Sequence, residues 1–100
     1  MRMTLTTTLV LQAIAHGRRY GLEIAEATGY PTGTVYPALR RLEQAAYLHS
    51  AWEREADAVR DARPQRRYYE ITPAGASALA RALEAVRALG ALRPSPKGAR

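Results

Sequence analysis

The sequence has no cysteine, which excludes a disulfide framework and any metal site built on thiolates. It also has no run approaching the ~20 apolar residues that a membrane-spanning helix needs. Near the start, threonines interrupt an apolar stretch and no small-residue cleavage site follows it, so we expect no signal peptide. These absences together predict a cytoplasmic chain that does not enter a membrane.

Residues that carry catalysis or bind metal ions are also scarce. The two histidines, His16 and His49, are far apart and lack acidic or thiol neighbours at ligand spacing, so we expect no zinc site. Ser50 and Ser77 lack the sequence context of a catalytic triad, and there is no glycine-rich phosphate loop. We therefore predict that the chain is not an enzyme and needs no metal or cofactor.

Lysine is almost missing, because fourteen of the 15 basic residues are arginine. With 9 acidic residues, the formal net charge is +6 at pH 7. The fork-shaped guanidinium suits phosphate groups and the edges of guanine bases. A basic total bears on partners and solubility rather than on fold, so it fits a nucleic-acid partner but also an ordinary soluble basic domain.

A chain of 100 residues is expected to form one domain with one modest core. Between Thr4 and Ala15 the apolar residues cover more than one helical face. This predicts a helix buried on two sides, one against the core and one against a second subunit. A short helix from about Tyr20 to Thr28 should follow, closed by Gly29 in the left-handed conformation.

The next predicted helix reads TGTVYPALRRLEQ over residues 32–44. Its apolar residues recur every three or four positions and gather on one side, while polar residues gather opposite. Pro37 is tolerable if the first turn is loose or the helix begins at Thr34, because the earliest N–H groups have no helical partner. Thr32 and Thr34 are both candidates for the N-cap, and the sequence does not choose between them.

Aromatic and β-prone residues over 47–53 and 66–71 predict two strands, joined by the charged connection READAVRDARPQ into a β-hairpin with a long tip. Thr72 and Pro73 then provide a cap and a first residue for a further helix, which an apolar stripe continues to Gly90. The pattern divides the chain into a body over 1–72, a C-terminal helix over 73–90 and a mobile tail over 91–100.

This order of elements is that of a winged helix-turn-helix, an α+β fold that is mostly helical. In such a fold the third helix enters the major groove of DNA, and hydroxyls and guanidiniums hold phosphates. Arginines at the hairpin tip would follow the minor groove or the backbone, although the acidic residues before them also allow a solvated charged loop. The predicted DNA contacts are Thr32, Gly33, Thr34, Tyr36, Pro37, Arg40, Arg41, Arg63, Gln65, Arg66 and Arg67.

Three stretches, YGLEIAEATG, TGTVYPALRRLEQAAYL and RPQRRYYEITPAGASAL, resemble the PadR family of bacterial transcriptional regulators over roughly residues 5–83. The resemblance implies a winged-helix homodimer, usually a repressor, in the short form with a single C-terminal dimerisation helix. We expect it to bind an inverted repeat in double-stranded DNA, with Tyr36 at the phosphate backbone. The first and last helices would form the dimer contact through Leu5, Leu9, Leu79, Leu83 and Val86.

The chain departs from the family pattern in several places. Many members have a tyrosine where this chain has Leu22, and we expect Tyr20 to take the place of that DNA contact. Relatives often have glycine after the recognition helix where Ala46 stands, so we expect a different turn there, and the wing lacks its usual glycine. Some short relatives bind flat aromatic drugs between subunits. We expect Trp52 to pack under the wing instead, and any small-molecule effector is unidentified.

Two other functions fit parts of the pattern. A winged helix with a basic face could instead bind an acidic partner protein tightly, and its affinity for a DNA duplex would then respond little to salt. Tyr68 and Tyr69 could stack single-stranded nucleic acid, but two strands offer a small platform and strand alternation buries one of the pair. The sequence discloses neither the operator nor the regulated genes, nor whether the protein represses or activates.

Overall fold

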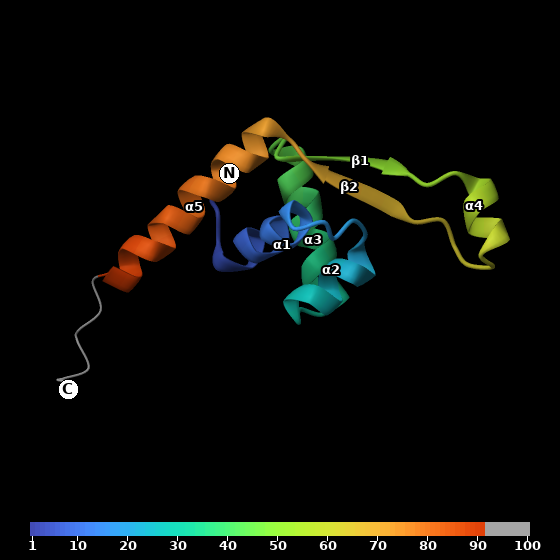
Figure 1. Ribbon diagram of the computed structural model, residues 1–100, viewed down its shortest axis with the longest axis horizontal. Helices are drawn as coiled ribbons and strands as arrows, with labels where there is room; N and C mark the ends of the chain where they lie inside the picture. Colours follow the sequence, from blue (N-terminus) through green and yellow to red (C-terminus); the bar gives the residue numbers. More distant parts are fainter. Residues whose placement is uncertain (92–100) are drawn as a thin grey trace.

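The computed structural model of the protein describes residues 1–91. Figure 1 shows three helices packed together, with a β-hairpin reaching out on one side and a long last helix on the other. This is the predicted mostly helical α+β winged helix-turn-helix. No helix in this part of the chain is long and apolar enough to cross a bilayer. The elements are α1 (Leu5–Ala15), α2 (Gly21–Thr28), α3 (Thr32–Gln44), β1 (Leu48–Trp52), α4 (Glu55–Arg60), β2 (Arg67–Ile71) and α5 (Pro73–Ala91).

The ends of the first two helices are closed by local chemistry. At the start of α1 the Thr7 N–H donates to the Thr4 hydroxyl at 3.1 Å, and the Thr4 N–H donates to the Thr7 hydroxyl at 2.9 Å. The Thr8 hydroxyl, although buried, donates to the Thr4 carbonyl at 2.7 Å. Gly29 ends α2 with a φ of 79°, as predicted.

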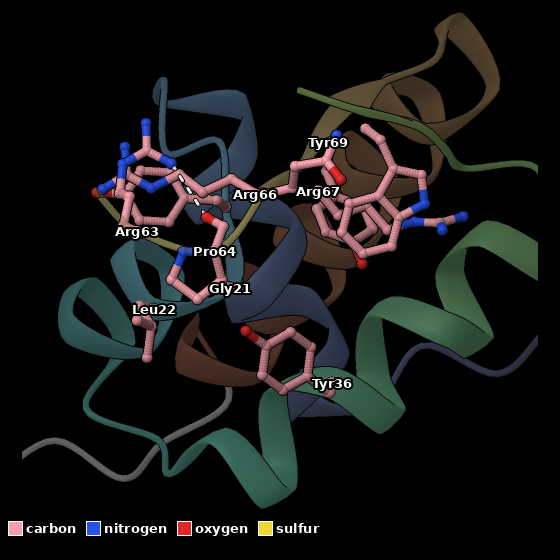
Figure 2. Close-up of a pocket in the computed structure, with 11 residues that line it drawn as sticks. Gly21, Leu22, Tyr36, Arg63, Pro64, Arg66, Arg67 and Tyr69 are labelled. Atoms are coloured by element: carbon pink, nitrogen blue, oxygen red, sulfur yellow. Dashed lines mark hydrogen bonds between the residues drawn. The ribbon is translucent and has the colours of Figure 1, made fainter. Parts of the chain in front are cut away.

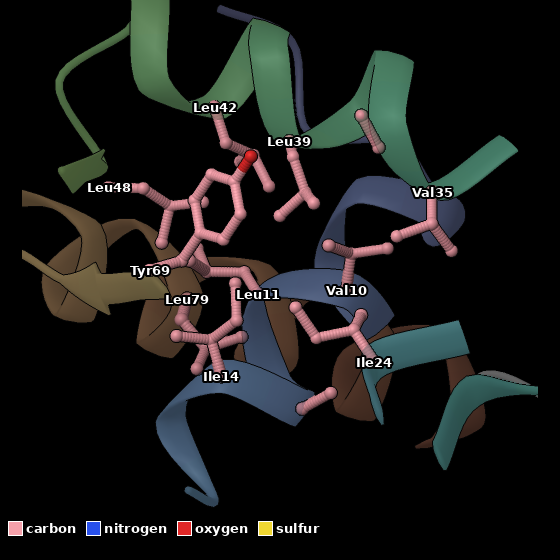
Figure 3. Packing of buried hydrophobic residues seen from close by; sticks show 12 residues of the cluster. Val10, Leu11, Ile14, Ile24, Val35, Leu39, Leu42, Leu48, Tyr69 and Leu79 are labelled. Carbon is pink, nitrogen blue, oxygen red and sulfur yellow. The ribbon is translucent and has the colours of Figure 1, made fainter. Parts of the chain in front are cut away.

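One hydrophobic core joins α1, α2, α3, the two strands and the first turns of α5 (Figure 3). Because α3 gives one whole face to this core, its other face remains outside. The packing follows the predicted apolar periodicity. The most deeply buried large side chains are Val10, Leu11, Ile24, Val35, Leu39, Leu42 and Leu48.

The start of α3 differs from the prediction. The helix begins at Thr32 with Pro31 as its N-cap residue and no side-chain cap, so neither Thr32 nor Thr34 is the N-cap. Pro37 therefore lies well inside the helix. It has no N–H to donate to the carbonyl of Gly33, four residues earlier, and Gly33 is exposed, so water can reach that carbonyl.

The sequence indicated a long charged connection between the strands without assigning it a helix, and α4 forms within it. Glu55 and Asp57 stand in its first turn and Arg60 in its last turn, which is the charge order that the helix dipole favours. Arg60 also pairs with Asp57 across one turn at 3.0 Å. The last helix likewise runs past its predicted end at Gly90 to Ala91, and the rest of the predicted tail, 92–100, lies outside the described residues.

The junction of α3, β1 and α5 is held by backbone contacts. Ala46 has a φ of 63°, which is the left-handed conformation that glycine adopts most easily. Alanine adopts it here at the cost of some backbone strain. Its carbonyl accepts a hydrogen bond from the Thr72 hydroxyl at 2.7 Å, and the Thr72 N–H donates to the Tyr47 carbonyl at 3.0 Å. The Thr72 hydroxyl also caps α5 by accepting from the Gly75 N–H at 3.0 Å, as predicted.

Replacing Gly75 by alanine is expected to lower the free energy of unfolding by about 1–3 kcal/mol. A Cβ at this position would collide with the backbone carbonyl of Tyr47, so α5 would have to move away from β1. Chemical denaturation measures the effect. Gly90→Ala is the matched control, because a Cβ there meets nothing within 4 Å, and an unchanged midpoint for Gly75→Ala would contradict the close approach.

Candidate nucleic-acid interface

The outer face of α3 is open to solvent. Arg40 is exposed on the side opposite the core, together with Gly33, while Pro37 beside them is half-buried. Within residues 1–91 neither Arg40 nor Arg41 takes part in an ion pair, so their guanidiniums are available to a partner. Arg41 lies on a flank of the helix, where it lines a hollow with N-terminal residues rather than the central face.

Tyr36 is held on the opposite flank, against α2. Gly21, the first residue of α2, is buried, and a Cβ at Gly21 would collide with the Tyr36 ring. Tyr36 is nevertheless 43% exposed, so the contact fixes the position of the residue without burying it. Tyr20, the N-cap residue of α2, stands next to this contact. No pattern in the sequence indicates that Gly21 matters, because the requirement comes from Tyr36, fifteen positions later.

The wing is organised around one buried carboxylate. Glu53, whose side chain is 5% exposed, receives both terminal nitrogens of Arg63, at 2.6 and 2.7 Å. It also accepts from the Arg66 N–H at 3.0 Å and from the Tyr68 hydroxyl at 3.3 Å. The Gln65 amide donates to the Glu53 carbonyl at 2.8 Å. Arg63 and Gln65 were predicted to contact DNA, but their side chains are engaged in folding the wing, and Arg63 is only 22% exposed.

This network predicts how the wing responds to acid. The hydrogen bonds from Arg63, followed by those from the Arg66 N–H and the Tyr68 hydroxyl, lower the pKa of Glu53 from 4.5 to about 2. A carboxyl whose pKa falls on folding stabilises the fold above its unfolded value. That contribution should therefore be complete above pH ~4.5 and be lost as the pH falls toward ~2.

An acid titration followed by circular dichroism and by Trp52 fluorescence should show this loss. Glu53→Gln removes the charge and should loosen the wing already at neutral pH, whereas Glu84→Gln, in an exposed pair on α5, should leave the titration unchanged. Equal acid sensitivity of the unchanged chain and the Glu53→Gln chain would contradict the role of Glu53.

The two remaining wing arginines lie where the strands meet the tip of the hairpin, at the start of β2. The guanidinium of Arg66 stands 4.0 Å from the centre of the Tyr20 ring and has no carboxylate partner within residues 1–91. The Nε of Arg67 donates to the Ser50 hydroxyl at 2.9 Å, and its Nη2 lies 3.5 Å from Glu43. Tyr20, which was predicted to replace a DNA-contacting tyrosine of relatives, therefore has an arginine of this chain against its ring.

Trp52 was predicted to pack under the wing, and this was wrong, because its side chain is 61% exposed. It pairs with Arg67 at the far end of the antiparallel ladder that begins with Leu48 opposite Ile71. Only Leu48 of β1 reaches the core, because the outer half of the hairpin has no helix beneath it (Figure 1). Arg67 lies 5.4 Å from the indole ring instead.

The hairpin does not present Tyr68 and Tyr69 together as a stacking platform for single-stranded nucleic acid. Tyr69 is buried in the core at 7% exposure. Tyr68 is covered by the edge of Tyr20, with ring centres 6.0 Å apart, and by the guanidinium of Arg19 at 4.6 Å. With Tyr69 buried and Tyr68 already in contact with Tyr20 and Arg19, the pair forms no open stacking platform.

The tip of the wing is not basic. Residues 53–63 hold four acidic against three basic side chains, and several of them pair with one another. Such a tip does not attract phosphate groups. The positive charge of the wing lies instead at the start of β2, which moves the predicted wing contact from the tip to this end of the strands.

A groove of about 460 Å³ lies between the wing and the helix-turn-helix. In Figure 2 the side chains of Arg66 and Arg67 come to it from the wing, and those of Leu22 and Tyr36 from the helices. The groove thus brings together residues that are 45 positions apart in the sequence, from Leu22 to Arg67. Trp52 and Leu22, both exposed and both lining it, were not among the predicted contacts.

The residues predicted for the dimer contact fall into two groups. Leu5 and Val86 are 63% and 49% exposed, and Leu9 is half-buried. Leu79, in contrast, is 8% exposed within the core of the single chain, and Leu83 packs partly against that core. Leu89, which is 67% exposed at the far end of α5, extends the apolar stripe beyond the predicted set.

Comparison with known proteins agrees with this architecture. A PadR family transcription regulator from hypervirulent Clostridium difficile R20291 superposes with a TM-score of 0.77 at 23% identity, covering 89% of this chain and 94% of that one. A transcriptional regulator from Clostridium thermocellum superposes with a TM-score of 0.70 at 26% identity, covering 87% of this chain and 84% of that one. A PadR family regulator from Eggerthella lenta superposes with a TM-score of 0.64 at 28% identity, covering 82% of this chain and 74% of that one. No curated protein sequence matches the chain. The family described as "Transcriptional regulator PadR-like family" matches residues 10–81, and the chain belongs to this family of transcriptional regulators, which implies that it binds DNA and is not an enzyme.

Proposed function

We propose that the chain acts as a homodimer that binds an inverted repeat in double-stranded DNA and thereby represses transcription. The observation that carries the proposal is the juxtaposition of unpaired arginines on two elements. Arg40 stands on the outer face of α3, and Arg66 lines the groove between the wing and the helices. Neither has a carboxylate partner within residues 1–91, so both guanidiniums are available to phosphates and base edges.

In this proposal α3 enters the major groove and β2 follows the backbone beside it. Arg40, with Gly33 and Pro37, would face base edges, while Tyr36 and Arg66 would hold the strand that passes along the groove. Thr32, Thr34, Arg41 and Arg67 would flank these contacts, and Tyr20 would support Arg66. The acidic tip at α4 would point away from the duplex, because its carboxylates and the phosphates are both negative and repel each other.

The dimer is supported by the shape of α5. This helix leaves the body of the molecule (Figure 1), and its exposed Val86 and Leu89 lack a partner within the described chain. The exposed Leu5 on α1 offers a second apolar contact. A two-fold dimer would place two recognition helices on half-sites about one helical turn apart, ~34 Å centre to centre. Repression follows from the family resemblance, and it would take place in the cytoplasm.

The test is selection of bound fragments from random duplex DNA by the purified protein. Recovery of one motif repeated in inverted orientation is the expected result. The salt dependence of the affinity adds a second readout, because each phosphate contact releases about one counterion and log K should fall steeply with log salt. A chain that ignores duplex DNA at low salt, or whose duplex affinity hardly responds to salt while it binds an acidic protein tightly, would overturn the proposal in favour of a protein-interaction module.

A further inference from the structure

A second hollow borders α3, toward the end of the helix. Its volume is about 570 Å³, and its walls are the residues that precede α1 and the last turn of α3. The fold thus brings the start of the chain beside the proposed recognition helix, although the two segments are far apart in the sequence. The lining residues are Met1, Arg2, Thr4, Arg41, Gln44 and Ala45.

This hollow and the wing lie on opposite flanks of α3. Tyr36 lines the wing groove together with Arg66. Glu43 also faces the wing, because its carboxylate lies 3.5 Å from Arg67. At 100° per residue, Arg41 is about 140–160° around the helix axis from Tyr36 and Glu43. The exposed outer face of α3 therefore runs between the wing on one side and the hollow on the other.

The hollow carries positive charge that the described residues do not neutralise. Arg2 and Arg41 both line it, and both are exposed. Neither forms an ion pair within residues 1–91. No carboxylate of this part of the chain lines the hollow, and Glu43 is turned toward the wing. Two guanidiniums in one hollow without a carboxylate favour an anionic partner, and their geometry suits phosphate.

We propose that Arg2 and Arg41 bind the phosphate backbone of the DNA strand opposite the one that the wing holds. The major groove is bordered by two backbones, so a helix lying in it has phosphates on both flanks. Arg66 would hold one strand, and the hollow would hold the other. This contact rests on the proposed function and adds to it Arg2, which lies outside both the helix-turn-helix and the wing. Because phosphates carry no sequence information, it should strengthen binding to all sequences alike.

Titration of a labelled duplex at several salt concentrations tests the contribution of Arg2. Arg2→Gln should weaken binding about two- to fivefold, as expected for the loss of one exposed ion pair. It should also reduce the salt slope by about one counterion per chain and leave the base preference unchanged. Arg2→Lys keeps the charge and should restore the slope. Arg81→Gln, a change of an exposed arginine on α5, is the matched control and should not alter the slope.

Duplexes that carry a single methylphosphonate linkage, which removes the charge of one phosphate, locate the contacts on the two strands. The unchanged chain should lose affinity at positions on both strands of each half-site. Arg2→Gln should abolish the response at a position on one strand, and Arg66→Gln should abolish it at a position on the other strand. If both variants lose their response on the same strand, the assignment to opposite strands is overturned.

Failure of this contact can be distinguished from failure of the proposed function. If the unchanged chain binds no duplex, both fail together. If it binds, and Arg2→Gln binds equally well with the same salt slope, only the contact by Arg2 fails. The denaturation midpoint of Arg2→Gln should equal that of the unchanged chain, because Arg2 is exposed and precedes α1. A lower midpoint would attribute the weaker binding to folding and would overturn the contact.

Discussion

A chain carrying Val86→Arg is expected to be monomeric and to bind a duplex with two half-sites about 10²–10⁴-fold more weakly than the unchanged chain. Val86 is 49% exposed in an apolar stripe that no other part of the described chain covers. An arginine there would put an unpaired charge into the proposed dimer contact. A monomer binds one half-site only, so it loses the gain that comes from linking two contacts. Light scattering reports the mass, and titration of the labelled duplex reports the affinity.

Ala88→Arg is the matched control for this substitution. It adds the same side chain to the same helix two residues later, about 200° around the axis, and should remain dimeric. Val86 is a better position than Leu83, because Leu83 packs partly against the core and its replacement would also disturb folding. A Val86→Arg chain that remains dimeric would show that this face of α5 is not the contact. A monomer with undiminished affinity would show that DNA binding does not require the dimer.

Arg40→Ala is expected to weaken binding to the selected DNA by about 1–3 kcal/mol and to relax the preference at particular base pairs. The reason is that Arg40 stands at the centre of the outer face of α3 and is not held by a carboxylate within residues 1–91. Affinities for the selected site and for single-base variants of it measure both effects. If the loss is the same for every sequence, Arg40 holds a phosphate and does not read a base.

Arg66→Ala is the comparison that separates these roles. On the wing it should weaken binding to all sequences and reduce the salt slope by about one counterion. Arg41→Ala, on the flank of α3, should have a smaller effect on base preference than Arg40→Ala. No change of affinity or salt slope with Arg66→Ala would remove the wing from DNA binding.

The elements that bury a continuous apolar face could be predicted from the sequence. The apolar positions of α3 are also its core positions, and Gly29 ends α2 where a left-handed residue was expected. The wing was less predictable. Short-range patterns did not reveal that Glu53 would receive Arg63 across a ten-residue connection, because that pairing depends on how the tip folds back. Arg63, which the sequence suggested was free to contact DNA, is therefore held in an ion pair with Glu53.

The apolar stripe of α5 shows a second limit of sequence patterns. Leu79, Leu83 and Val86 are all aliphatic and follow one another at the three- or four-residue spacing of one helical face. Their surroundings differ because the body of the molecule ends partway along the helix, so Leu79 is buried and Val86 is exposed. The exposure of Trp52 has the same cause on the hairpin, whose outer half extends past the core. Helical or strand periodicity indicates which side is apolar, but not how far the neighbouring elements reach.

The position of Trp52 has a practical consequence. It is the only tryptophan in the chain, and it lies in the groove beside Arg67. Its emission should shift in wavelength and intensity when a molecule enters the groove and excludes water from the indole. Trp52 fluorescence can therefore be used to follow occupancy of this surface, and no dye has to be attached.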